Sequence, residues 1–226
     1  MRRAVLHWSG GKDSVLSLDL MLRSGDYEVT TLLATVTEED DLSLMHRVHA
    51  RLLHRQARSL GVPLRLVRVP RRPSNEVYES RHAEALTELQ GRGVRFAVFG
   101  DRYLEDVRAY REKNLARIGM KGVFPLWKDP SQMAIRSFID RGFEAVVVTV
   151  DTRILPAEYA GRPLDDDFLD DLPPGTDFCG ERGEFHSFVY DGPIFSEPVS
   201  WEPGKRTREG EFAHLELLPI EQDLDR

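Results

Sequence analysis

The chain has 226 residues, 41% hydrophobic and 31% charged, a composition typical of a soluble globular protein with room for one large domain or a domain with an appendage. The net charge of −7, from 31 basic and 38 acidic residues, argues against a nucleic-acid partner, because RNA-binding proteins usually carry a basic excess. The single cysteine, Cys179, excludes an intramolecular disulfide, and no apolar run is long enough to span a membrane, so we expect a cytoplasmic protein that binds neither membrane nor nucleic acid.

The first half of the chain alternates short β-branched stretches with longer amphipathic ones. This pattern predicts strands at 3–8, 29–36, 64–69 and 95–99 and helices at 13–24, 43–60, 76–92 and 103–118. Alternation at this spacing predicts a doubly wound parallel sheet with helices on both faces. Ligands of such sheets bind at the carboxyl ends of the strands.

The second half of the chain has a different pattern. A helix at 131–141 and a strand at 144–150 are followed by a segment rich in glycine, proline and acidic residues, with one clear strand at 185–190. This segment predicts a smaller C-terminal α+β lobe, and the charged tail beyond Glu202 is predicted to be partly disordered. We therefore expect an N-terminal domain over residues 1–126 and a substrate-binding lobe over residues 127–226.

The stretch AVLHWSGGKDSVLSL, residues 4–18, runs from the first predicted strand through two glycines directly into the first predicted helix. Glycines permit the dihedrals of a tight turn, and the first amides of a helix lack intrahelical partners and carry the positive end of its dipole. Such a turn binds phosphate. The candidate phosphate-binding residues are Ser9, Gly10, Gly11, Lys12, Asp13 and Ser14. Asp13 either caps the helix or helps to hold a magnesium ion.

Two common phosphate-binding motifs are excluded at this turn. A Walker loop needs serine or threonine after its Gly-Lys pair, where this chain has Asp13, and the Gly-x-Gly-x-x-Gly pattern is missing. The remaining pattern, Ser-Gly-Gly-x-Asp-Ser, resembles the PP-loop of the ATP pyrophosphatase superfamily, whose fold is Rossmann-like (adenine nucleotide alpha hydrolase-like). The resemblance implies that the loop holds the pyrophosphate end of ATP with Mg²⁺, and that Lys12 and Asp13 assist attack of a substrate oxygen on the α-phosphorus.

Three further stretches narrow the resemblance. Residues 98–127 and 177–195 are similar to the diphthine–ammonia ligase family, and residues 45–64 are similar more loosely. The family implies an ATP-dependent amide ligase in which a carboxylate is adenylated and ammonia displaces AMP. The implied partners are ATP, ammonia and a carboxylate-bearing acceptor, either a small molecule or a modified histidine of an elongation factor. A homodimer is one option for the assembly.

The same resemblance implies roles for individual residues beyond the loop. Ala34 and Thr35 would lie against adenine, and Gly100 and Asp101 would lie close to the nucleotide or the metal. The remaining implied site residues are Glu112, Glu181, Glu184 and His186. The last three would line the acceptor pocket, where a glutamate pair and a histidine could orient ammonia or take its proton if burial tunes their pKa values.

Some positions depart from the members that make diphthamide. Those members carry an Arg-Val-Glu run where this chain has Tyr110-Arg111-Glu112, and proline and asparagine where Phe178 and Arg182 stand. These differences favour the less characterised branch of the family. The identity of the acceptor, diphthine or another carboxylate, therefore stays open.

Several residues admit a second interpretation. His46 and His49 could share a metal ion and Cys179 could be a nucleophile. We favour a surface or pocket-edge position for the histidines and a packing or pocket-lining role for the cysteine. We interpret the acidic run from Asp165 to Asp171 as the solvated face of a short helix rather than a cation site.

Two other functions remain open. One is a module that binds ATP or AMP without catalysis, and the other is a PP-loop enzyme that acts on a different small-molecule carboxylate. Thiolation of tRNA is disfavoured, because it needs a sulfur relay and a basic face that the sequence does not suggest.

Overall fold

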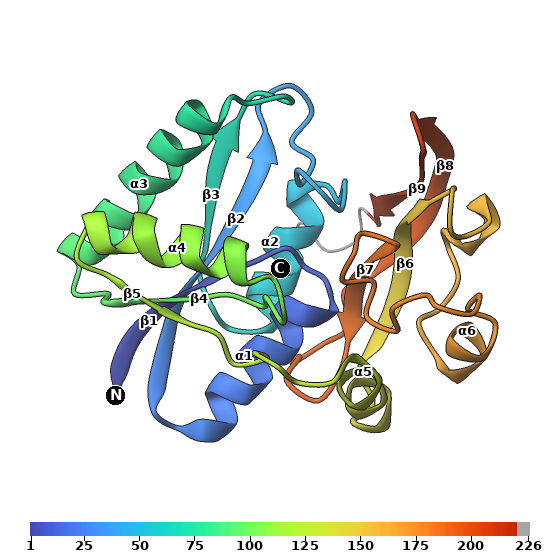
Figure 1. The fold of residues 1–226 in the computed structure, drawn as a ribbon, viewed down its shortest axis with the longest axis horizontal. Coiled ribbons are helices and arrows are strands. Elements are labelled where there is room, and N and C mark those ends of the chain that lie inside the picture. The colour runs from blue at the N-terminus through green and yellow to red at the C-terminus, as the bar shows by residue number, and fades with distance from the viewer. Residues whose placement is uncertain (221–226) are drawn as a thin grey trace. The chain divides into compact units, whose positions relative to one another are not determined.

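The computed structural model describes residues 1–220 and divides the chain into two compact units (Figure 1). Unit 1 consists of three segments, Met1–Ser9, Asp13–Leu44 and Gly61–Asp129. Unit 2 consists of Gly10–Lys12, Met45–Leu60 and residues 130–220.

Unit 1 is built on a five-stranded parallel sheet with the strand order β3-β2-β1-β4-β5. Its strands are β1 (Arg2–His7), β2 (Tyr27–Thr37), β3 (Leu64–Val69), β4 (Phe96–Val98) and β5 (Lys121–Val123). The predicted parallel α/β sheet is thus confirmed. Only β5 was not expected, because its three residues, Lys-Gly-Val, contain a single β-branched apolar side chain.

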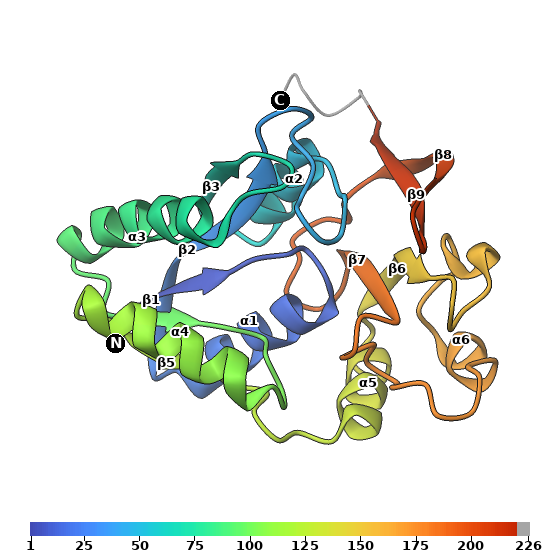
Figure 2. The same cartoon turned by 45° about the horizontal axis from the view of Figure 1, so that its top comes forward.

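The helices of unit 1 cover both faces of this sheet, as a doubly wound fold requires. They are α1 (Lys12–Ser24, whose first residue belongs to unit 2), α3 (Asn75–Gly91) and α4 (Glu105–Arg117). The chain moves in one direction along the sheet from β1 to β2 and in the opposite direction from β4 to β5, so right-handed crossovers put α1 and α4 on opposite faces. Helices α3 and α4 lie side by side in Figures 1 and 2.

One apolar core joins α3 and α4 to the sheet. Alternate residues of the strands, including Val5, Leu33 and Val67, pack with Leu86 and Leu89 of α3. Because successive residues of a strand point to opposite faces, this pattern assigns the following positions on the same face, His7 and Thr35, to the α3/α4 side.

Unit 2 contains a four-stranded antiparallel sheet with the order β7-β6-β9-β8. Its elements are α2 (Ala50–Ser59), α5 (Ser131–Asp140), β6 (Glu144–Asp151), the 3₁₀ turn η1 (Ala157–Tyr159), α6 (Asp166–Asp170), β7 (Phe185–Asp191), β8 (Trp201–Glu209) and β9 (Phe212–Pro219). The prediction of a C-terminal α+β lobe is confirmed.

Two predictions about local structure are wrong. The tail beyond Glu202 is not partly disordered up to the last described residue, because β8 and β9 form a hairpin there and pair over most of their length. The helix expected at 43–60 begins only at Ala50, because His49 is its N-cap and a ring nitrogen of His49 accepts the Arg51 amide hydrogen at 3.1 Å. Residues 221–226 lie outside the described part of the chain.

Among residues 1–220, none of the helices has both the length and the apolar character needed to cross a bilayer.

Candidate functional site

The predicted phosphate loop lies at the carboxyl end of β1 and leads into α1, as expected from the sequence. Gly10 has φ +79°, in the left-handed region that favours glycine, and a Cβ there would lie 2.7 Å from Oε1 of Gln56. At Gly11 a Cβ would lie 2.5 Å from Cε1 of His46 and 2.9 Å from the carbonyl oxygen of Ser187. Both glycines are therefore required by the geometry of the turn.

Strand β7 and helix α2 hold the loop within unit 2. The carbonyl oxygen of Gly10 accepts hydrogen bonds from the Val189 amide and from Nε2 of Gln56, both at 2.9 Å. Ser187 accepts the Lys12 amide hydrogen through its hydroxyl oxygen at 3.2 Å. The Gln56 amide also donates to the Val189 carbonyl at 2.6 Å, so it ties the loop and β7 together.

Lys12 is the buried cation of the loop, with 4% of its surface exposed. Its Nζ atom lies 5.4 Å from the centroid of the Phe185 ring, within cation–π range. Lys12 is the first residue of α1, at the positive end of the helix dipole, so its position suits an anionic ligand.

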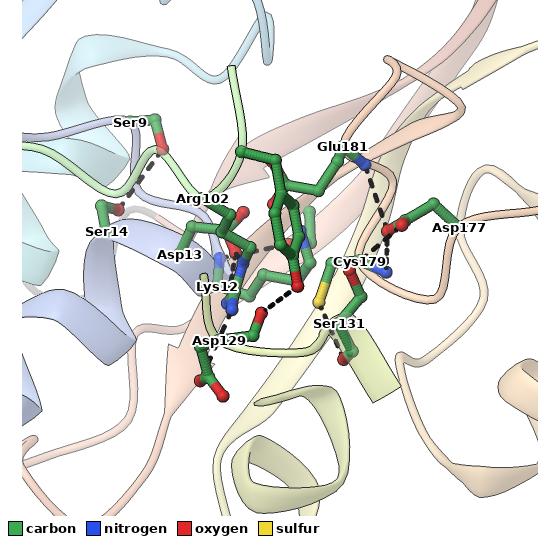
Figure 3. A network of polar contacts seen from close by, with 12 residues as sticks. Ser9, Lys12, Asp13, Ser14, Arg102, Asp129, Ser131, Asp177, Cys179 and Glu181 are labelled. Carbon is green, nitrogen blue, oxygen red and sulfur yellow. Dashed lines mark hydrogen bonds and ion pairs between the residues drawn. The ribbon is translucent and has the colours of Figure 1, made fainter. Parts of the chain in front are cut away.

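Unit 1 holds the other loop residues through a buried arginine. Arg102 is fully buried and donates to Oδ1 of Asp13 from Nε at 3.2 Å and from Nη2 at 2.9 Å (Figure 3). Its Nη1 lies 3.7 Å from a carboxylate oxygen of Asp129. The hydroxyl oxygens of Ser9 and Ser14 lie 3.3 Å apart, at hydrogen-bond distance.

Arg102 was not among the residues singled out from the sequence. It stands two residues after Gly100, at the carboxyl end of β4, and the backbone there approaches α1 closely. A Cβ on Gly100 would lie 3.1 Å from the backbone carbonyl carbon of Asp13. The signal that could have identified Arg102 is the Gly100-Asp101-Arg102 run at the end of a predicted strand, of which the sequence analysis names only Gly100 and Asp101.

The two residues expected beside adenine lie at the carboxyl end of β2. Ala34 is completely buried and pairs with Leu66 of β3. The Thr35 hydroxyl lies 2.9 Å from Nε2 of His82 on α3. Their contact with adenine stays a prediction.

Asp101 and Glu112 each pair with an arginine of α4. Asp101 accepts from Nε and Nη2 of Arg111 at 2.5 and 3.2 Å, a bidentate arrangement. Glu112 accepts from Nε of Arg108 at 2.9 Å, one turn earlier on the same exposed helix face. A catalytic role for Glu112 stays a prediction.

The C-terminal candidates Glu181 and Glu184 belong to one tight loop of unit 2. Glu184 is 1% exposed, and its two carboxylate oxygens accept the backbone hydrogens of Asp177 and Arg182 at 3.1 and 2.9 Å. Asp177 in turn accepts the Cys179 amide hydrogen at 2.8 Å. These bonds give Glu184 a role in shaping the loop, and its catalytic role stays a prediction.

The same loop is anchored to α5 (Figure 3). The Ser131 hydroxyl donates to Oδ2 of Asp177 at 3.0 Å, and the Cys179 thiol donates to the Ser131 carbonyl at 3.2 Å. Cys179 is buried, with 1% of its surface exposed, which agrees with a packing or pocket-lining role.

The His186 ring packs at an angle against the ring of His46, for which the sequence favours a surface or pocket-edge position. The ring centroids of His186 and His46 lie 4.7 Å apart, and Nδ1 of His46 lies 2.9 Å from the Ser187 carbonyl oxygen. His46 thus lies beside Gly11 and β7, which agrees with the pocket-edge position that the sequence favours for it. Within residues 1–220, no three His, Cys, Asp or Glu side chains are grouped so that they could hold a metal ion.

The acidic run of the C-terminal lobe forms a short helix, as expected. Asp165 is the N-cap of α6 and accepts the Phe168 amide hydrogen at 2.9 Å. The following acidic residues are exposed, while Phe168 and Leu169 are buried beneath them. The run is therefore the solvated face of a helix.

A doubly wound sheet whose first strand ends in a serine- and glycine-rich turn defines a PP-loop α/β protein. Residues 1–122 match the family model of the diphthamide synthase N-terminal domain, and residues 129–216 match that of the diphthamide synthase C-terminal domain. The chain therefore belongs to the diphthamide synthase family.

The chain is also similar to proteins named as diphthine–ammonia ligases. The chain is 26% identical over 216 residues to the diphthine–ammonia ligase of Bos taurus and, with the same figures, to that of Homo sapiens. It is 27% identical over 218 residues to the diphthine–ammonia ligase of Rattus norvegicus. Each alignment covers 84% of this chain and 79% of the relative.

Proposed function

We propose that this protein is an ATP-dependent amide ligase that adenylates a carboxylate, releases pyrophosphate and transfers ammonia to the activated acyl group. The observation that carries the proposal is the match of both diphthamide synthase domains, in order, over residues 1–122 and 129–216. The geometry of the glycine-rich loop supports the same chemistry independently.

The loop suits the first half-reaction. A carboxylate oxygen of the acceptor forms a bond to the α-phosphorus of ATP, and the bond between that phosphorus and the bridging oxygen of pyrophosphate breaks. Negative charge accumulates on the departing pyrophosphate. Lys12 and the positive end of the α1 dipole are fixed in advance, so they stabilise this charge without reorganisation.

The loop also suits a magnesium ion that arrives with the nucleotide. Mg²⁺ is usually bound through one or two carboxylates together with substrate phosphates, so a dedicated protein cage is unnecessary. Asp13 fits as one ligand, because Arg102 fixes the orientation of its carboxylate. When bound, the ion would neutralise phosphate charge.

The second half-reaction needs a nucleophile and a base. The nitrogen of ammonia forms a bond to the acyl carbon, the bond to AMP breaks, and the nitrogen loses a proton. We assign this role to His186, because its imidazole packs against His46, and the His46 ring lies beside Gly11 of the loop.

The acceptor is the least constrained part of the proposal. The curated relatives are diphthine–ammonia ligases, so diphthine is the first acceptor to test. Tyr110, Phe178 and Arg182 differ from the diphthamide-forming pattern, which makes a panel of other carboxylates the second step.

The test is isothermal titration of ATP with Mg²⁺ into the wild type, Lys12→Gln and the matched control Lys113→Gln, whose side chain is exposed on α4. Loss of a charged hydrogen-bond donor to phosphate predicts about 10- to 100-fold weaker ATP binding for Lys12→Gln and no change for the control. Pyrophosphate should compete with ATP in the wild type. Equal ATP affinity in all three proteins would contradict the proposal, and thermal unfolding of each free protein controls for misfolding.

A further inference from the structure

Within unit 2, His46 contacts both the glycine-rich loop and the histidine assigned to ammonia transfer. A Cβ added to Gly11 would lie 2.5 Å from Cε1 and 3.1 Å from Nδ1 of His46, so the imidazole packs directly on the backbone of the turn. The centroid of the same ring lies 4.7 Å from that of the His186 ring. One side chain therefore lies against two parts of the site that serve different steps.

The hydrogen bond of His46 fixes both the orientation and the hydrogen position of its ring. Nδ1 lies 2.9 Å from the Ser187 carbonyl oxygen. A carbonyl oxygen can only accept, so Nδ1 is the nitrogen that carries the hydrogen, and in the neutral ring Nε2 is then the acceptor. A hydrogen bond to one ring nitrogen is the usual way in which a protein fixes an imidazole.

The Ser187 carbonyl oxygen that accepts this bond lies directly beside the loop. It would be 2.9 Å from a Cβ on Gly11, and the hydroxyl oxygen of the same serine accepts the Lys12 amide hydrogen at 3.2 Å. A carbonyl oxygen carries a fixed partial negative charge, which disfavours an anion on the adjoining amides. The Nδ1 hydrogen of His46 offsets that charge and satisfies the acceptor.

The backbone next to His46 has a conformation that residues other than glycine rarely adopt. Arg47 has φ +57°, in the left-handed region. The Thr149 hydroxyl of β6 donates to the His46 carbonyl oxygen at 3.5 Å, and Nη1 of Arg47 lies 3.8 Å from a carboxylate oxygen of Glu209. Such backbone persists where its surroundings over-determine it, and it clusters at functional sites. The turn at Arg47 thus holds the His46 ring against the loop.

We propose that His46 is a positioning residue of the ligase. By donating from Nδ1 to Ser187 it keeps the glycine-rich turn in the form that binds phosphate, and by ring packing it orients His186. The inference rests on the proposed function, because the ligand of the turn is the pyrophosphate end of ATP. His46 acts through the loop and His186 rather than through the reacting atoms.

The experiment compares pyrophosphate binding, by isothermal titration in the presence of Mg²⁺, for the full chain and three variants. His46→Phe keeps a ring beside Gly11 but has no hydrogen to donate. His46→Asn keeps a donor, because its amide nitrogen takes about the place of Nδ1. His54→Phe, on the exposed face of α2, is the matched control. We expect about 3- to 10-fold weaker binding for His46→Phe, recovery of most of the affinity in His46→Asn, and wild-type affinity in the control.

A purely structural role of His46 predicts another pattern. The Tm of His46→Phe would fall while the pyrophosphate affinity of the folded protein stayed unchanged, and this result would overturn the inference. Affinity that His46→Asn fails to recover would also overturn it, because donation from Nδ1 would then not be what positions the turn.

The packing of His46 on His186 has its own measurement in the free protein. In nitrogen-15 NMR spectra of the imidazoles, Nδ1 of His46 should carry the hydrogen. The His186 signals should move more in His46→Asn, which removes the neighbouring ring, than in His46→Phe, which keeps one. A His46 ring with its hydrogen on Nε2 alone, or His186 signals that stay fixed in both variants, would contradict the positioning role.

Failure of the proposed function gives a different result. If neither ATP nor pyrophosphate binds the wild type, the ligase mechanism is refuted, and this inference is refuted with it. If pyrophosphate binding is weakened in Lys12→Gln and unchanged in His46→Phe, the inference alone is refuted and the proposed function stands.

Discussion

At the scale of single residues, Gly11 is the position where one methyl group should do most damage. The added Cβ would lie 2.9 Å from the Ser187 carbonyl oxygen, which belongs to the paired backbone of β7 and cannot move aside. We predict that overpacking in Gly11→Ala lowers the free energy of unfolding by about 1–3 kcal/mol. For a chain of this size this corresponds to a fall of roughly 3–10 °C in Tm. The matched control is Gly91→Ala, because Gly91 has nothing within 4 Å of its Cβ position.

Differential scanning calorimetry of the two alanine variants tests this prediction by measuring their Tm values. The control, at the end of α3, should be neutral or slightly stabilising, since alanine restricts the unfolded chain. Equal Tm values for both variants would show that the turn tolerates a side chain at Gly11.

Arg102 is the second residue whose substitution should strongly lower the stability of the protein. It is fully buried between Asp13 and Asp129, so its removal leaves a charged group without its main partner. We predict that Arg102→Ala lowers the free energy of unfolding by about 3–5 kcal/mol. Arg92→Ala, which breaks an exposed ion pair with Glu88, should cost no more than about 0.5 kcal/mol. Urea denaturation measures the free energy of unfolding of both variants. Similar losses in the two variants would contradict the structural role of Arg102.

At the scale of elements, the loop before β7 depends on one carboxylate. Glu184 accepts two backbone hydrogens within the loop, and Glu184→Gln would turn an N–H group toward one of these donors. We predict a loss of about 1–3 kcal/mol in stability and faster hydrogen exchange at the amides of Asp177 and Arg182. Unchanged exchange at these two amides, relative to the exposed control Glu202→Gln, would refute the structural role of Glu184.

The elements of the chain differ in how well the sequence predicts them. Buried strands such as β6, with its run of valines, show a clear apolar signal. Strand β8 lies at the edge of its sheet and, like many edge strands, is exposed and charged over most of its length. Its sequence therefore resembles that of a polar, unstructured tail. Its partner β9 buries Ala213, His214, Leu215 and Leu217, so it lacks a strict alternation of buried and exposed residues.

At the scale of the whole molecule, the site is predictable where it is local and unpredictable where it is not. The serine- and glycine-rich loop is contiguous, so its composition and place after a strand suffice. Its supports come from far along the chain: 89 residues separate Arg102 from Asp13, and 175 separate Ser187 from Lys12. His46 likewise lies 141 residues from its partner Ser187. No short spacing pattern encodes such contacts.

The stability of the protein should fall in mild acid. In the folded state the pKa of His82 is about 4, below the ordinary value of 6.5, so between these values the unfolded chain binds a proton that the folded chain does not. The contribution is complete above pH 6.5 and is lost toward pH 4, up to about 3 kcal/mol for this residue. The lowered pKa of His7 acts in the same direction.

Urea titrations at pH 7.0, 5.5 and 4.5 measure this loss. His82→Gln keeps a hydrogen-bonding group near Thr35 but removes the titration, so its stability should depend less steeply on pH than that of the wild type. Parallel pH profiles for the two proteins would show that His82 is not the titrating group.

The most direct measurement is the identity of the products formed from ATP, followed by phosphorus NMR in the presence of Mg²⁺, ammonia and a carboxylate acceptor. We predict AMP and pyrophosphate in equal amounts, formed only when the acceptor is present and strongly reduced in Lys12→Gln. Formation of ADP and inorganic phosphate instead would place the attack at the γ-phosphorus and contradict the ligase mechanism.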